Sequence, residues 1–188
     1  MRNPFRFARR AASAAFLVVL LCLPAWAASP QDDPAVPAIL DRAESLFQSM
    51  KARDYPAIFA ALSAKSRETI VAETTSALAA AGRQARPEGA TAVDAPTAPA
   101  KNPPPDPEAV RSDFIAGGPI ARDYWDAFLR RFDPDAPLEH SRWEIGSVKQ
   151  DRAEILVTHH GADHAATLKM FREDAGWKVG LVETFWSR

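Results

Sequence analysis

The sequence of 188 residues has little cysteine and little tyrosine, with one Cys (Cys22) and two Tyr. A single cysteine cannot close a disulfide within the chain, so a packed core must stabilise the fold. The sequence also lacks a glycine-rich phosphate loop and a Gly-x-Ser-x-Gly turn, which mark nucleotide binding and one class of serine hydrolases. With 47% hydrophobic and 25% charged residues, the composition excludes a fully disordered chain and a multispanning membrane protein.

The first 27 residues are typical of a secretory signal peptide. Four of the first ten residues are Arg, an apolar run covers 11–23, and Ala25-Trp26-Ala27 forms a small-x-small cleavage site. We therefore expect cleavage after Ala27 and a periplasmic or secreted protein without a membrane span. An uncleaved anchor is the alternative, because the apolar run is only slightly shorter than the roughly 20 residues of a membrane helix. Lipidation of Cys22 is disfavoured by the bulky Leu21 that precedes it.

The chain that remains after cleavage is acidic. Cleavage removes four arginines and no acidic residue, which leaves 161 residues with 19 Lys and Arg against 24 Asp and Glu, a net charge of −5. An acidic chain without a run of Lys and Arg is a poor partner for nucleic acid. We expect a flexible lead at 28–35 and a single domain at 36–188, long enough to bury a core without disulfides.

Apolar residues three and four apart predict a series of helices, bounded by proline and glycine. These helices cover 39–53, 57–62, 65–81, 107–115 and a stretch from Pro119 to Phe132. Between the third and the fourth, residues 84–107 contain seven Pro, six Ala and a single large apolar side chain. Such a segment cannot bury enough surface to offset its ordering entropy, so we predict a disordered insert within the domain.

Four strand-like runs follow the helices, at 138–149, 152–160, 164–172 and 176–186, and short turns join them. Helices followed by a meander indicate an α+β fold. We expect N-terminal helices packed on a curved four-stranded antiparallel meander sheet.

The turns between the strands predict which side chains share one face of the sheet. A two-residue turn at Gly161-Ala162 sets His159 opposite His164, and a turn at Asp174-Ala175 sets His164 opposite Phe185. A three-residue turn at 150–152 sets Trp143 opposite His159, while Glu183 lies opposite Ala166, one row further in. The candidate ligand-binding site, at the rim of the sheet, consists of Trp143, His159, His164, Glu183 and Phe185.

Glu183 allows three interpretations. A carboxylate among apolar side chains is costly to bury unless it is paired or protonated. It could pair with a helix arginine such as Arg122 or Arg130, contact a ligand together with the histidines, or take part in acid–base chemistry. A zinc site is disfavoured, because strand alternation sends His160 to the opposite face from His159. We expect no metal and no other cofactor.

One helix end and three strand segments form a recognisable pattern: LFQSMKARDY at 46–55, WEIGSV at 143–148, AEILVT at 153–158 and ATLKMFREDAGWKV at 166–179. With this layout the chain resembles the NTF2-like (cystatin-like α+β) superfamily, in particular small secreted bacterial members of unknown function. The resemblance covers 36–83 and 119–186, and it implies a cone of helices lining a curved sheet. The steroid-isomerase-like members place a tyrosine and aspartates in the cone. Glu183 and histidines occupy the inward positions here, so no catalytic residue is transferred.

Cones of this kind host isomerases, dehydratases, ligand carriers or no ligand, so the fold does not determine the function. We expect a non-enzymatic exported protein that binds a small apolar ligand or a protein partner. One alternative is a small lyase or isomerase that uses the cone rim. Another is an envelope assembly component or homodimer that uses the outer face of the sheet, where the registers place Leu156, Phe171, Val182 and Trp186.

Overall fold

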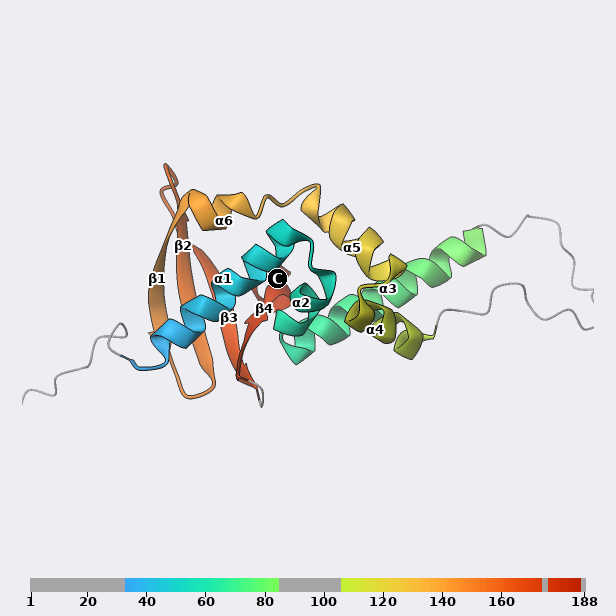
Figure 1. Ribbon diagram of the computed structural model, residues 1–188, viewed down its shortest axis with the longest axis horizontal. Coiled ribbons are helices and arrows are strands. Elements are labelled where there is room, and N and C mark those ends of the chain that lie inside the picture. Colours follow the sequence, from blue (N-terminus) through green and yellow to red (C-terminus); the bar gives the residue numbers. More distant parts are fainter. Residues whose placement is uncertain (1–32, 85–105, 174–175, 187–188) are drawn as a thin grey trace, which may run out of the picture.

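The computed structural model describes residues 33–84, 106–173 and 176–186 (Figure 1). The predicted signal peptide at 1–27, most of the predicted lead at 28–35 and nearly all of the predicted insert at 84–107 lie outside the described residues. Within the described ranges, no helix combines the length and the hydropathy needed to cross a membrane.

The described residues form seven helices and four strands, which confirms the α+β prediction. The helices are α1 (Val36–Ala52), α2 (Tyr55–Ala61), α3 (Ala64–Gln84), α4 (Pro107–Ala116), α5 (Pro119–Leu129), α6 (Asp135–Glu139) and α7 (Leu181–Phe185). The strands are β1 (Ser141–Val148), β2 (Arg152–His159), β3 (Ala166–Glu173) and β4 (Gly176–Gly180). They form one antiparallel sheet in the order β1-β2-β3-β4.

Local signals in the sequence explain where the helices begin and end. α1 ends at Arg53, whose backbone is left-handed, and the next residue, Asp54, accepts a hydrogen bond from the N–H of Ala57 to cap α2. α4 ends at Gly117, which also has a positive φ, and Asp113 caps the start of α5 by accepting from the N–H of Ala121. The helix α6 is not predicted from the sequence, because Pro134 before it and Pro137 within it indicate a helix end.

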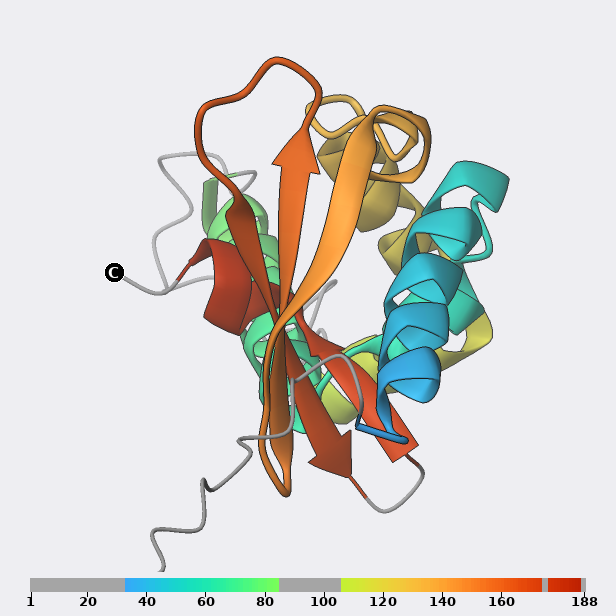
Figure 2. The ribbon, with the colours of Figure 1, turned by 90° about the vertical axis from the view of Figure 1, so that its left-hand side faces the viewer.

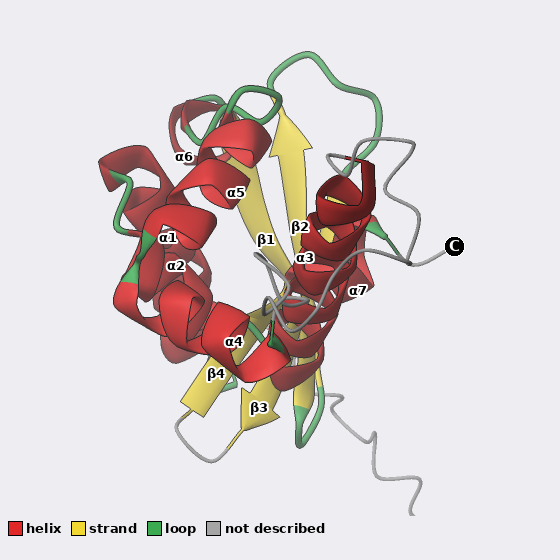
Figure 3. Cartoon of the chain, turned by 90° about the vertical axis from the view of Figure 1, so that its right-hand side faces the viewer, coloured by secondary structure: helices red, strands yellow, loops and turns green. Residues whose placement is uncertain are grey.

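The helices α1, α2, α4 and α5 lie over one face of the sheet, as Figure 3 shows. In Figure 2 the other face of the strands is turned to the viewer, and no described helix crosses it. The buried apolar side chains of the helices and of this covered face belong to one cluster, with Trp125, Phe114, Ile39, Leu46 and Ile155 among its largest fully buried members.

The β2–β3 and β3–β4 hairpins have the predicted registers. Val157 pairs with Ala166, Ile155 with Leu168, and Met170 with Val179. His159 and His164 do not form the predicted pair, because β2 ends at His159 and β3 begins only at Ala166.

The predicted β1–β2 register is wrong by two residues. Trp143 lies opposite Val157 rather than His159, and Ile145 lies opposite Ile155. Two local features account for the shift: Lys149 and Arg152 bond directly across a two-residue turn, and the register slips by one more residue at Gly146. His159 therefore faces Ser141, at the very end of the sheet.

The predicted fourth strand is too long, because the chain leaves the sheet at Gly180 and forms α7. A side chain at Gly180 would collide with the ring of Phe171, so only glycine fits where the chain turns. In α7, Thr184 then accepts a hydrogen bond from the N–H of Lys169 on β3, at 3.0 Å. The predicted outer-face group is corrected accordingly: Val182 is buried in α7 and Trp186 follows it, while Leu156 and Phe171 remain on strands.

Candidate functional site

A chain of aromatic rings in contact runs through the molecule from α2 to β1. Each ring lies with its centroid 5.0–5.9 Å from that of the next, which is the range in which aromatic pairs attract. In order, the rings belong to Phe59, Phe114, Tyr124, Trp125, Phe128, Phe132, Phe47 and Trp143.

The helix α5 and the turn after it position the middle of this chain. Ala121 and Trp125 are fully buried, whereas Tyr124 and Phe128 lie four residues apart and are only partly buried. Phe132 follows after another four residues, where the N–H of Phe132 still bonds to the carbonyl of Phe128, at 3.1 Å. One side of α5 thus packs inward, and an adjoining stripe of rings reaches the surface.

Two pockets lie along this stripe. The larger has a volume of about 540 Å³ and is lined by Tyr124, Ala127, Phe128, Arg130, Arg131, Phe132, Phe185 and Trp186. The smaller has a volume of about 200 Å³ and is lined by Phe47, Phe132, Ala136, Pro137, Ser141, Val157, His159, Ala166, Leu168, Thr184 and Phe185. Both share Phe132 and Phe185, whose ring centroids are 6.5 Å apart. We call the two pockets together the aromatic groove.

The groove leaves large apolar side chains in contact with water. Phe185 is 49% exposed and Trp186 is 40% exposed, and both line the larger pocket. Adjacent exposed aromatic side chains beside a hollow are typical of binding surfaces. The volume of the larger pocket also falls within the roughly 300–1,000 Å³ of small-molecule sites.

The charged groups of the groove are all basic or histidine, since neither pocket is lined by an Asp or a Glu. Arg130 and Arg131 line the larger pocket and are exposed. No ion pair links either guanidinium to a carboxylate of the described residues, whereas Lys51, Arg53 and Arg67 each have an acidic partner within 4 Å.

Tyr124 remains a neutral phenol at physiological pH. Burial raises the pKa of Tyr124 well above its usual value, and the negative charge of Glu73 raises it further. Tyr124 therefore adds apolar surface and no charge to the wall of the groove.

Two of the five predicted site residues line the groove. Phe185 lines both pockets, and His159 lines the smaller one. The predicted row across four strands does not exist, because β4 ends at Gly180 before reaching it. Phe185 enters the groove from α7 instead.

Trp143 and His164 have other positions. The ring of Trp143 packs edge-on against Phe47 at 5.6 Å, and its Nε1 donates to the carbonyl of Pro137 at 2.7 Å, so it joins β1 to α1 and α6. His164 is exposed in the loop between β2 and β3 and lines neither pocket.

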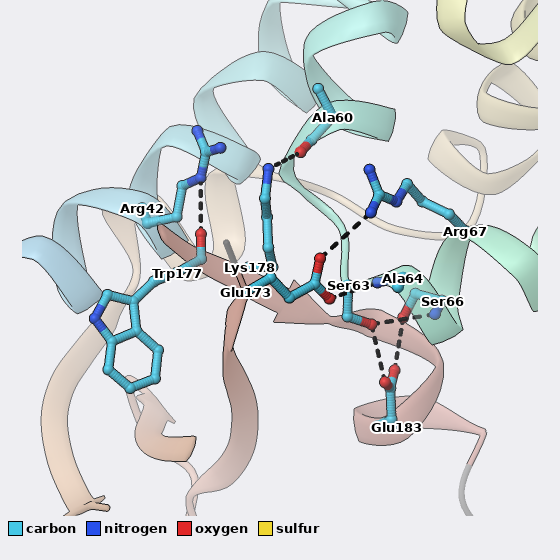
Figure 4. Close-up of polar contacts among 10 residues, drawn as sticks. All are labelled: Arg42, Ala60, Ser63, Ala64, Ser66, Arg67, Glu173, Trp177, Lys178 and Glu183. Atoms are coloured by element: carbon cyan, nitrogen blue, oxygen red, sulfur yellow. Dashed lines mark hydrogen bonds and ion pairs between the residues drawn. The ribbon is translucent and has the colours of Figure 1, made fainter. Parts of the chain in front are cut away.

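Glu183 lines neither pocket, and it pairs with neither Arg122 nor Arg130, the helix arginines that the sequence offered as partners. It lies on α7 and is 9% exposed, with its two oxygens accepting from the hydroxyls of Ser63 (2.9 Å) and Ser66 (2.6 Å), as Figure 4 shows. Ser63 directly precedes α3, and its hydroxyl oxygen also accepts from the N–H of Ser66. The carboxylate thus lies at the N-terminus of α3, where the helix dipole favours a negative charge.

The polar groups around Glu183 bind one another and form a structural joint. Glu173 accepts from the N–H of Ala64 at 2.6 Å and pairs with Arg67 at 3.3 Å. Lys178 is buried on β4 and donates to the carbonyl of Ala60 at 2.6 Å (Figure 4). Burial lowers the pKa of Lys178, and so do the positive charges of Arg42 and Arg67. These contacts hold β3 and α7 against α3, and β4 against α2.

The described residues hold no group of three or more His, Cys, Asp and Glu side chains placed to bind a metal ion. From the sequence, Arg130 was considered only as a possible partner of Glu183, and neither Arg131 nor the aromatic stripe of α5 was expected to line a site. The sequence signal for the aromatic stripe was Phe132, which continues the four-residue spacing of Tyr124 and Phe128 beyond the end of the helix.

Comparison with protein-family models, with curated proteins and with solved structures finds no match to this chain.

Proposed function

We propose that this chain is an exported NTF2-like protein that binds a small apolar ligand in the aromatic groove. The observation that carries the proposal is the pair of exposed aromatic side chains, Phe185 and Trp186, beside a pocket of about 540 Å³. Covering such side chains removes apolar surface from water, which provides the free energy of binding. The signal-like N-terminus supports export, and ligand carriers are among the classes that NTF2-like cones host.

The lining favours binding over catalysis. General acid–base catalysis needs a proton donor or acceptor that a second group orients. His159 is the one histidine among the residues that line the two pockets, and none of these residues is an Asp or a Glu. A lyase or isomerase function therefore has less support than a binding function.

The fluorescence of 1-N-phenylnaphthylamine, an apolar dye that brightens when it leaves water, tests the proposal. We expect the purified protein to bind the dye and Phe185→Ala to bind it roughly tenfold more weakly, because about 1–2 kcal/mol of apolar contact is lost. Ile115→Ala is the matched control, since Ile115 is 60% exposed on α4 and lies outside both pockets.

The proposal fails if the wild-type protein does not bind the dye, or if Phe185→Ala and Ile115→Ala bind it equally well.

Native mass spectrometry of the protein purified from its own envelope fraction identifies the natural ligand. A retained small molecule supports the proposal. A retained protein partner in place of a small molecule contradicts it.

A further inference from the structure

We propose that the ligand of the aromatic groove is a single-chain amphiphile with an acidic head group, and that Arg130 and Arg131 bind this head group. The inference rests on the proposed binding function and adds the chemical class of the ligand. A carboxylate, sulfate or phosphate monoester attached to one alkyl chain has the required chemistry.

The positive rim of the larger pocket contrasts with the rest of the chain. The whole sequence has 23 Lys and Arg against 24 Asp and Glu, yet the larger pocket is lined by two arginines and no acid. Six Lys and Arg side chains of the described residues form ion pairs, as in the contacts of Lys51 with Asp135 and of Arg53 with Asp126. Arg130 and Arg131 have no carboxylate of a described residue within 4 Å, which leaves both side chains available to an anion from outside.

The position of the two arginines relative to the apolar wall matches an amphiphile. Arg130 caps the C-terminus of α5 and Arg131 follows it, and both are exposed residues that line the pocket whose wall includes Phe128 and Phe185. A head group bound at this rim stays in water, while its alkyl chain covers the exposed aromatic rings. Guanidinium groups bind carboxylates and phosphates through paired, charge-assisted hydrogen bonds, which gives selectivity for an acidic head.

A neutral or cationic ligand fits the rim less well. A neutral head leaves the two positive charges without a counter-charge, and a cationic head is repelled by them. The smaller pocket offers no alternative anchor for a cation, because it is also lined by no acidic side chain.

Isothermal titration calorimetry with three probes of equal chain length tests the inference: decanoate, decanol and decyltrimethylammonium, each below its micelle concentration. We expect decanoate to bind roughly tenfold more tightly than decanol, which corresponds to the attraction of two exposed guanidinium groups. We expect decyltrimethylammonium to bind most weakly. The indole N–H signal of Trp186 in NMR spectra should shift with decanoate, because Trp186 lines the same pocket.

The variants separate charge from packing. Arg130→Gln combined with Arg131→Gln should weaken decanoate binding roughly tenfold and leave decanol binding unchanged. Arg130→Lys with Arg131→Lys should restore most of the decanoate affinity. Arg152→Gln is the control, because Arg152 is an exposed arginine on β2 outside both pockets. A melting temperature close to that of the wild type shows that the double variant is folded.

Each other outcome contradicts one proposal or the other. Equal binding of decanoate and decanol, unaffected by the double Gln variant, overturns the acidic head group and leaves the apolar binding function in place. Absence of binding by all three probes overturns the binding function itself. If the protein sediments with phosphatidylglycerol vesicles but does not bind free decanoate, its partner is a bilayer surface. That result overturns a pocket for single amphiphiles.

Discussion

Glu183 shows how a buried carboxylate is stabilised without a basic partner. Among the described residues it is the one acidic side chain in the buried class, and both of its oxygens accept hydrogen bonds from serine hydroxyls. A buried charge without such partners would cost several kcal/mol. Its place at the start of α3 adds the favourable field of the helix dipole, so the carboxylate stabilises the junction of α3 and α7.

Glu183→Gln should therefore lower the free energy of unfolding by about 1–2 kcal/mol, because one oxygen acceptor and the negative charge are lost. Urea denaturation measures the change. Glu144→Gln is the control, since Glu144 is exposed on β1 and its pair with Arg142 at 3.4 Å contributes little. An increase in stability for Glu183→Gln would mean that the carboxylate is not compensated and that the structural role assigned to it is wrong.

At the scale of elements, the close contact between α2 and the end of α4 depends on one glycine. Gly117 has φ +66°, and a Cβ at this position would lie 2.7 Å from the side chain of Pro56 at the start of α2. Both the left-handed backbone and the contact with Pro56 favour glycine. Gly82 in α3 is different, because a Cβ there would have no atom within 4 Å and its φ is not positive.

These two glycines form a matched pair for mutation. Gly117→Ala should destabilise the protein by roughly 1–3 kcal/mol through backbone strain and steric overlap. Gly82→Ala should stabilise it by up to about 1 kcal/mol, because alanine favours a helix more than glycine does. Thermal denaturation with circular dichroism compares the two. Equal effects of the two substitutions would contradict the packing of α4 on α2.

At the scale of the whole molecule, the groove depends on contacts between distant parts of the chain. Phe47 from α1, Phe132 after α5 and Phe185 from α7 meet at the smaller pocket, although 138 residues separate the first from the last. Tyr124 lines the larger pocket and is partly buried against the helices. Ionisation of its phenol would place a negative charge in this apolar environment, so the folded state resists it.

The stability of the whole molecule should therefore fall at high pH. Because the pKa of Tyr124 is raised by folding, its contribution is fully present below the unfolded value of about 10 and is lost as pH rises towards the folded value. Tyr124→Phe should remove this part of the loss. Urea denaturation from pH 8 to pH 11 measures the free energy of unfolding of both proteins. Above pH 10 this free energy should fall less for the variant than for the wild type, by up to about 1.4 kcal/mol per pH unit. Parallel curves over the whole range would refute burial of the phenol.

The sequence was sufficient to predict those features of the fold that neighbouring residues determine. The helix starts at Pro107 and Pro119, the glycine stop at Gly117 and the β2–β3 register all follow from short-range chemistry. Side-chain alternation on two strands, joined by the loop at 160–165, leaves few registers that bury the apolar face. The same reasoning failed for β1, because the bulge at Gly146 adds a residue that the apolar pattern does not reveal.

By itself, the sequence determined the α+β class and the order of α1 to α5 and of the four strands, since local propensity and periodicity encode these. Only the tertiary structure decided the conformation of 181–186 and the location of the groove. The segment Leu181–Phe185 is too short for its helical period to be read, and its helix depends on contacts with Lys169 and Ser66, far away in the sequence. The short helix α7 places Glu183 against α3 and Phe185 in the groove, because the position of each side chain depends on which distant element it packs against.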